Sequence, residues 1–361
     1  MDIVLRCIDV DGMLAFFTTE LGCRLELVTP ADEPREFVVT APDGSSLRLV
    51  RDTVGRPVEL RWTVDEWPDP GRHLEAPDGT TIDIVVRSDE IDIPANAPSL
   101  SVEQAPTTAE FGEGRAGMGY RDLLPDRWGG RFIASHIVIA DGGEVADYVH
   151  YHRIRFQMIF VAAGWVEVVY EDQGEAFRMH AGDCVLQPPE IRHRVLRSSP
   201  GLEVIEIGCP AEHDTLVEHE ITLPTPMIDT GRLFGGQRFV RHVAADVAPV
   251  AATTPGFLAR STGIDVATDG LADVQVLTVD TATAASTSMT HDGEFAMYVG
   301  LNGCASMHVD VGGDETEVEI GPRDALALPP ASRWTWGAVD DGFEVLEVVL
   351  SADALRVATQ M

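Results

Sequence analysis

The chain has 361 residues, of which 45% are hydrophobic, so it can bury packed cores and lacks the composition of a disordered chain. Its formal net charge is −33, and no Lys occurs in the sequence, so every permanently charged cationic side chain is Arg. A chain of this charge repels phosphate groups, which excludes nucleic acid and anionic membrane surfaces as expected partners.

The five Cys residues are scattered, odd in number and without a Cys-x-x-Cys pair. This pattern favours reduced thiols in the cytoplasm over a disulfide framework or a structural zinc site. The first six residues lack the basic-then-apolar pattern of a signal peptide, and the longest apolar run, near residues 158–166, is too short to span a bilayer. We therefore expect a cytoplasmic protein of two or three domains.

Residues 1–88 have the pattern of a small α+β domain. Apolar side chains recur at helical spacing over residues 11–21, and Gly22 is a typical helix end. Strands are predicted at residues 3–6, 24–28, 36–40 and 46–50. A Pro-Asp-Gly turn separates the last two of these strands, and a second Pro-Asp-Gly hairpin follows within residues 74–85.

Residues 16–22 (FFTTELG) resemble the helix end of the βαβββ module found in glyoxalases and related vicinal-oxygen-chelate proteins. With the repeated hairpin, this resemblance implies a degenerate paired module over residues 1–88. That family carries metal ligands on its first and last strands, where this chain offers Arg6, Cys7 and Arg48 but no His. We therefore expect a structural or partner-binding role for this domain.

Two further segments follow in the chain. Residues 89–118 are rich in Pro, Ala, Ser, Glu and Gly, which predicts a linker or an arm laid over the next domain. Residues 119–222 contain short strand-like runs separated by Gly and Pro turns, the pattern of an antiparallel jelly-roll barrel. The predicted strands cover residues 132–140, 149–152, 157–161, 165–171, 175–179, 184–187, 192–196 and 203–207.

Three histidines in the predicted barrel suit a metal site. Alternate side chains of a strand point to the same face, so His150 and His152 present both imidazoles on one side. A third imidazole from a later strand, His193, can complete a facial ligand set for one divalent metal ion. The alternative is a plain β-barrel in which these histidines fill the core or the surface.

The spacing of these residues resembles the two signature motifs of the cupin superfamily. The first motif reads Gly143, His150, His152, Gln157 and Gly164, and the second reads Gly182, Pro188, Glu190 and His193. Gln157 stands where the family usually has Glu, and Glu190 where it usually has Gly. The resemblance implies that Gln157 either completes the metal shell or hydrogen-bonds a metal-bound water or a neighbouring strand.

Residues 223–361 repeat the plan of the preceding barrel, so the chain resembles a bicupin. The ligand positions align without gaps inside each block: His150 with Met289, His152 with His291, Gln157 with Ala296, and His193 with Trp334. Because only one candidate ligand survives, we expect the second barrel to bind no metal. Its Met, Ala and Trp are expected to fill the barrel rather than line a cavity, because small barrels usually pack their interiors.

Other residues are secondary candidates for the site. Tyr148 shares the strand parity of His150, so we expect it to face the cavity and orient a substrate or a proton, or else to be a core Tyr with a satisfied hydroxyl. His136 is also expected near the site. Arg131 and Arg155 are candidates for holding a substrate carboxylate.

The resemblance implies a mainly β protein with two cupin jelly-roll barrels in tandem behind a small α+β (βαβββ-like) domain. We predict a metal-dependent oxidoreductase, a mononuclear non-haem Fe(II) dioxygenase or oxygenase acting on a small chelating organic acid or enol, with Zn, Mn or Ni as alternative ions. A Lewis-acid isomerase, lyase or decarboxylase that does not use O₂ and a non-catalytic small-molecule-binding bicupin are the alternatives. A homodimer is expected from edge-to-edge pairing of barrels.

Overall fold

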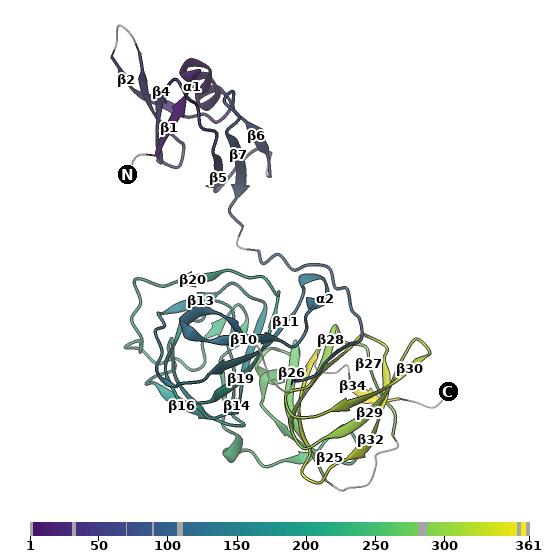
Figure 1. Ribbon diagram of the computed structural model, residues 1–361. Coiled ribbons are helices and arrows are strands. Elements are labelled where there is room, and N and C mark those ends of the chain that lie inside the picture. Colours follow the sequence, from purple (N-terminus) through teal and green to yellow (C-terminus); the bar gives the residue numbers. More distant parts are fainter. Residues whose placement is uncertain are drawn as a thin grey trace. The chain divides into compact units, whose positions relative to one another are not determined.

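The computed structural model describes residues 3–30, 34–69, 71–88, 90–106, 111–280, 287–351 and 355–358. The chain forms two compact units, Met1–Glu90 and Ile91–Met361, which are described separately below (Figure 1). In the part of the chain that the structure describes, no helix combines the length and the apolar character needed to cross a bilayer.

The first unit is an α+β domain whose first half has the predicted order of elements. Its elements are β1 (Ile3–Cys7), α1 (Val10–Thr19), β2 (Arg24–Thr29), β3 (Glu36–Thr40) and β4 (Ser46–Arg51). The Asp9 side chain accepts a hydrogen bond from the Gly12 N–H and caps α1, and Gly22 follows the helix with a φ of 66°. The strands pair in the order β1-β4-β3-β2, with β1 and β4 parallel.

The second half of this unit is a shorter copy of the first. Its strands are β5 (Glu59–Val64), β6 (His73–Glu75) and β7 (Thr81–Val86), which pair in the order β5-β7-β6. The pair β5-β7 is parallel and β6-β7 is antiparallel, as β1-β4 and β3-β4 are in the first half. The repeated Pro-Asp-Gly hairpin therefore marks a repeat of strand topology. No helix lies between β5 and β6 in the residues described there.

The first barrel of the second unit consists of two facing sheets (Figure 1). One sheet has the order β23-β17-β14-β19-β11-β10-β9, and the other has the order β16-β15-β18-β13-β20 with β12 beside β18. The strands are β9 (Gly112–Glu113), β10 (Gly119–Asp122), β11 (Ile133–Ile139), β12 (Gly143–Glu144), β13 (His150–His152), β14 (Phe156–Ala163), β15 (Trp165–Tyr170), β16 (Phe177–His180), β17 (Cys184–Leu186), β18 (His193–Ser198), β19 (Leu202–Cys209), β20 (Thr215–Val217) and β23 (Val240–His242). Short elements beside them are η1 (Arg115–Gly117), α2 (Arg127–Gly130) and the pair β21 (Leu233–Phe234) and β22 (Gln237–Arg238).

The second barrel reproduces the same strand order. Its sheets are β24-β25-β26-β33-β28-β31-β8 and β30-β29-β32-β27-β34. The elements are β8 (Ser101–Glu103), η2 (Ala244–Asp246), β24 (Val250–Ala251), β25 (Phe257–Ser261), α3 (Ile264–Ala267), β26 (Ala272–Val279), β27 (Met289–His291), β28 (Phe295–Asn302), β29 (Ala305–Val311), β30 (Asp314–Ile320), β31 (Ala325–Leu328), β32 (Arg333–Val339), β33 (Glu344–Leu350) and β34 (Leu355–Val357). Met289 lies opposite Trp334 as His150 lies opposite His193, so the sequence alignment of the repeats matches the strand register.

Edge strands differ from the sequence-based division of the chain. β8 lies in the segment predicted as a linker or arm, yet it pairs with β31 of the second barrel. β23 lies within residues 223–361, yet it pairs with β17 of the first barrel. Each barrel therefore receives an edge strand from outside its predicted range. The sequence did not predict these pairings, because a short strand with little periodicity carries no signal of its partner.

The two seven-stranded sheets pack face to face around one apolar core. Phe156 and Met158 of β14 lie in this core with Phe295 and Met297 of β28. Ion pairs surround it: Glu203 pairs with Arg323 at 2.6 Å, and Glu294 accepts hydrogen bonds from Arg131 and Arg155, each at 2.9 Å. The expectation that Arg131 and Arg155 hold a substrate is therefore wrong, since both guanidinium groups bind Glu294 between the barrels.

The interior of the second barrel is filled by side chains. Met289, Ala296 and Trp334 are at most 1% exposed and belong to its core, beside Tyr298 and Trp336. The surviving histidine, His291, directs Nε2 at the carbonyl oxygens of Leu328 and Pro329, at 2.9 and 2.8 Å. The predicted filling of this barrel is therefore present in the packing.

Candidate metal centre

Two strands bring three imidazoles together inside the first barrel. β13 carries His150 and His152 on one face, and the antiparallel neighbour β18 places His193 directly opposite His150. The ring centroids lie 4.2 Å apart for His150 and His193, and 5.2 Å apart for each of the other two pairs. Each side chain is buried, and the candidate ligand nitrogens all lie within 4.8 Å of one another. The span of a first coordination shell with bonds of about 2.1 Å is roughly 4 Å, so small side-chain rotations would suffice to close around one ion.

Hydrogen bonds at Nδ1 orient the three rings. His150 donates from Nδ1 to the carbonyl oxygen of Tyr148 at 2.8 Å, and His193 donates to that of Ile191 at 3.0 Å. A carbonyl only accepts, so these bonds place the proton on Nδ1 and the lone pair on Nε2. His152 Nδ1 lies 3.0 Å from the hydroxyl of Thr215.

The buried carboxyl group of Asp147 lies next to the His150 ring. Asp147 Oδ1 lies 3.7 Å from His150 Nδ1, and neither side chain is exposed. The other oxygen, Oδ2, accepts a hydrogen bond from the backbone N–H of Val195 at 2.9 Å, which fixes the carboxyl group. Asp147 therefore holds a fixed position behind the His150 ring, where metal-binding histidines commonly have a carboxyl group.

Gln157 extends from β14 toward the same site. Its Nε2 donates to Glu206 Oε1 on β19 at 2.5 Å, which sets the orientation of the amide. Its Oε1 is buried and has no hydrogen-bond partner among the residues that the structure describes. A buried acceptor without a partner is costly, so an ion or an ordered water beside this oxygen would relieve that cost.

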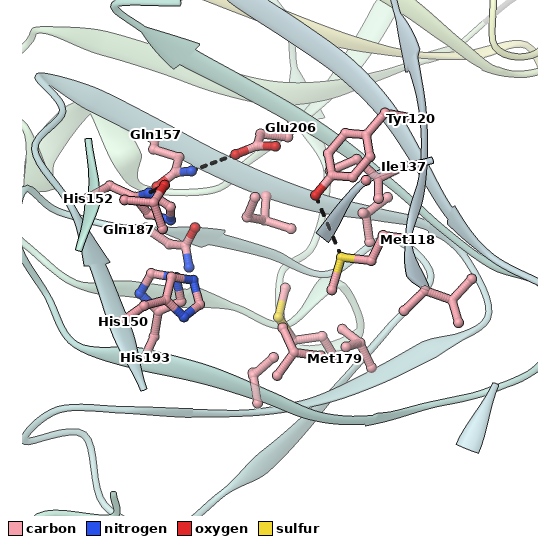
Figure 2. Close-up of a pocket in the computed structure, with 18 of the residues that line it drawn as sticks. Met118, Tyr120, Ile137, His150, His152, Gln157, Met179, Gln187, His193 and Glu206 are labelled. Carbon is pink, nitrogen blue, oxygen red and sulfur yellow. Dashed lines mark hydrogen bonds between the residues drawn. The ribbon is translucent and has the colours of Figure 1, made fainter. Parts of the chain in front are cut away.

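These residues line a cavity of about 410 Å³. The three histidines, Gln157 and Gln187 gather at one side of it, whereas Met118, Ile137 and Met179 lie at the other (Figure 2). The cavity therefore has a polar end that carries the candidate metal ligands and an apolar end made by side chains of several strands.

The sequence did not indicate three residues of the polar end. Glu206 lies on β19, where Leu202, Val204 and Glu206 line the cavity while Ile207 belongs to the core between the barrels. The repeat offered a signal, because Glu347 occupies the equivalent place opposite β28 in the second barrel.

The other two are His213 and Gln187. His213 follows β19, and its ring centroid lies 5.2 Å from that of His152. Gln187 donates to the hydroxyl of Tyr170 at 3.0 Å, and Tyr170 stacks on His193 at 5.6 Å. Burial raises the pKa of the Tyr170 hydroxyl, so it stays protonated.

Two sequence predictions about the surroundings of the site are wrong. Tyr148 does not line the cavity: its side chain is 41% exposed and contacts the edge of the His150 ring from outside. It precedes β13 and lies in an irregular segment, so strand parity does not apply to it. His136 points to the opposite face of β11 and contacts Glu203 at 3.0 Å, whereas Ile133, Ile137 and Ile139 line the cavity.

Comparison with known proteins agrees with this architecture. Residues 136–207, which contain all three histidines, match the cupin domain. Variant structures of oxalate decarboxylase from Bacillus subtilis align with TM-scores of 0.52, at 12% and 13% identity, over 76% of this chain and 82% or 81% of theirs. Another structure of that enzyme, described for its Mn(II) centres, aligns with a TM-score of 0.51 at 13% identity over 76% and 82% of the two chains. Among curated protein sequences no match was found. The second unit therefore has the tandem jelly-roll fold of a bicupin.

Proposed function

We propose that the chain is a metal-dependent cupin enzyme with one mononuclear site in the first barrel. His150, His152 and His193 would hold a divalent ion. The observation that carries this proposal is the convergence of three buried imidazoles whose candidate nitrogens lie within 4.8 Å of one another. Sites of this type keep coordination positions open for water or substrate, as catalytic metal sites require.

The donor atoms favour iron over manganese. Imidazole nitrogen suits Fe, Zn, Ni and Cu, whereas carboxylate and water oxygens suit Mn and Mg. Gln157 contributes an amide where the cupin pattern has Glu, so no carboxylate is supplied by the motif itself. An Fe(II) ion held in this way would supply the capacity to bind a chelating substrate and O₂ at neighbouring positions. We therefore propose oxidation or oxygenative cleavage of a small chelating organic acid or enol.

The protein side chains would position the reactants and exclude water. Gln157, fixed by Glu206, would direct Oε1 at the ion or at a water bound to it. The apolar walls of the cavity would keep the reacting atoms dry, which strengthens every electrostatic interaction inside it. In this proposal Tyr148 has no role in the chemistry, because its side chain lies outside the cavity.

A second candidate function is Lewis-acid chemistry without O₂, such as decarboxylation. It is supported by the likeness of the fold to oxalate decarboxylase, one structure of which is described for its Mn(II) centres. A metal ion acting as a Lewis acid polarises a bound carboxylate or carbonyl and needs no oxidant.

Metal analysis of paired variants tests the proposal. Protein reconstituted with Fe(II) and freed of unbound ion should contain one iron per chain, and His152→Ala should lose it. His291→Ala is the matched control, because His291 occupies the equivalent position in the second barrel. Iron retained by His152→Ala, or absent from the wild type, would refute the site.

Oxygen consumption separates the two chemistries. Turnover of a 2-oxo acid or an enol by the Fe(II)-loaded protein should consume O₂ in an electrode chamber and should stop under strict anaerobiosis. Unchanged turnover without O₂, with release of CO₂, would instead support the Lewis-acid reaction.

A further inference from the structure

We infer that the substrate of the first barrel is a monoanionic chelator with an extended apolar body, and that Glu206 sets this charge preference. The inference rests on the proposed metal site and narrows its substrate class. It excludes small dicarboxylates such as oxalate as preferred substrates. Three features of the cavity support it. No Arg is among the described residues that line the cavity, Glu206 contributes a carboxyl group to it, and its polar and apolar side chains lie at opposite ends.

No Arg lines the cavity among the described residues, and the sequence has no Lys. Arg131 and Arg155, which the sequence suggested for holding a carboxylate, bind Glu294 between the barrels. Among the described residues that line the cavity, a second carboxylate on a substrate would therefore find no Arg to pair with. Burying an unpaired charge is costly, so such a group would weaken binding.

Glu206 adds a carboxyl group to an end of the cavity whose candidate metal ligands are neutral. The three imidazoles are neutral when they bind a metal, and the amide of Gln157 is neutral, so a divalent ion brings a charge of plus two. Glu206 lines the same cavity and accepts a hydrogen bond from Gln157. Its carboxylate opposes part of the charge of the ion and repels a second carboxylate of a substrate, so this end of the cavity favours a monoanion over a dianion.

The opposite end of the cavity is built to receive an apolar group. Met118, Ile137 and Met179 are at most 7% exposed and lie across the cavity from the histidines (Figure 2). Tyr120 lies beside them, and its hydroxyl donates to the Met118 sulfur at 3.7 Å. A volume of about 410 Å³ lies within the usual range of about 300–1,000 Å³ for small-molecule sites. A very small ligand such as oxalate would leave this apolar end in contact with water, whereas a hydrocarbon tail would fill it.

A homologous series of 2-oxo acids tests the inference. These acids chelate through one carboxylate and the adjacent keto oxygen, and they differ only in the length of their tails. Titration calorimetry of the Fe(II)-loaded full chain under argon should show affinity rising about fourfold per methylene group from pyruvate to 2-oxooctanoate. Oxalate should bind more weakly than 2-oxohexanoate.

Two variants assign the preference to named residues. Met118→Phe should reduce the affinity for 2-oxooctanoate by about tenfold or more and leave that for pyruvate within about twofold, whereas the volume-conserving Met118→Leu should change neither. If Met118→Phe fails to fold, Val204→Phe on β19 fills the same cavity. Glu206→Gln should raise the affinity for oxalate relative to pyruvate on the order of tenfold, since it removes one negative charge.

The outcomes separate this inference from the proposed function. One bound iron together with affinity that is flat along the series, or with oxalate as the tightest ligand in the wild type, would overturn the inference alone. The same holds if Glu206→Gln leaves the ratio of oxalate to pyruvate affinity unchanged. A chain that binds no metal would overturn both the site and the substrate class.

Discussion

Glu347 gives the most direct prediction of how stability depends on pH. Its carboxyl group is 1% exposed inside the second barrel, and its Oε1 accepts a hydrogen bond from Gln275 Nε2 at 2.6 Å. Its other neighbour is the hydroxyl of Tyr298, which lies opposite Glu347 on β28 and is buried in the same core. Burial raises the pKa of Glu347 to about 7, against the opposing effects of the Gln275 amide and the Tyr298 hydroxyl. We expect the neutral analogue Glu347→Gln to reveal the cost of ionising this group.

The magnitude follows from the difference in pKa between the folded and unfolded chain. The folded pKa of about 7 exceeds the ordinary value of 4.5, so the stabilisation from the protonated group is complete below pH 4.5 and is lost as the pH rises to 7. Each pKa unit corresponds to about 1.4 kcal/mol, so the ionised group costs the folded state about 3 kcal/mol above pH 7. Relative to the wild type, Glu347→Gln should therefore gain about 3 kcal/mol between pH 4 and pH 8.

Hydrogen exchange of β33 measures this effect locally, because the opening free energy of a core strand reports the stability of its own barrel. Every other titrating group is common to the two proteins, so the difference between them isolates Glu347. Parallel pH dependences of the wild type and the variant would refute the reasoning, because they would mean that the carboxyl group is already solvated or neutralised in the folded barrel.

The remaining predictions concern the barrel contact, the metal shell and the filled core. Hydrogen bonding by His136 and the charge of Arg323 lower the pKa of Glu203 to about 2. The ionised Glu203 therefore stabilises the fold above pH 4.5, and this contribution is lost as the pH falls toward 2. In urea unfolding, Glu203→Gln should lose less stability than the wild type over that interval. Thr215→Val removes the partner of His152 Nδ1 and should weaken Fe(II) binding about 10- to 100-fold in a competition assay, with metal-free stability nearly unchanged. Trp334→Ala should cost about 3–5 kcal/mol in urea unfolding, and a loss below 1 kcal/mol would show that the second barrel is not packed as described.

The clustering of the three histidines could be predicted because alternation along a strand fixes which side chains share a face. His150 and His152 lie two residues apart within β13, so their convergence needs only that the strand exists. The alignment of the second barrel with the first could also be predicted from the sequence, since both blocks align without gaps. The same reasoning failed for Tyr148, which lies just before β13, where the backbone is no longer a regular strand.

Tertiary contacts could not be predicted from single residues in the same way. The sequence makes Arg131 and Arg155 candidates for holding a substrate carboxylate, but their partner Glu294 lies more than a hundred residues away and in the other barrel. Glu206 was overlooked because β19 carries two glutamates, Glu203 and Glu206, and the sequence gives no indication which of them lies beside a cavity. Only the packing of two sheets determines whether such a face meets a core or an open space.

The two barrels show how one scaffold accommodates a site in one copy and a core in the other. Glu206 and Glu347 occupy equivalent places, and each accepts a hydrogen bond from a Gln amide, but Gln157 comes from β14 and Gln275 from β26. In the second barrel Ala296 replaces Gln157, so the carboxyl group turns to a different strand for its donor. Trp334 replaces His193 and fills the space that the first barrel keeps open. The same carboxyl group therefore occurs with and without the three histidines, and its surroundings differ. Beside the histidines we propose that it sets the charge preference of a cavity, and inside the packed core we expect it to make stability depend on pH.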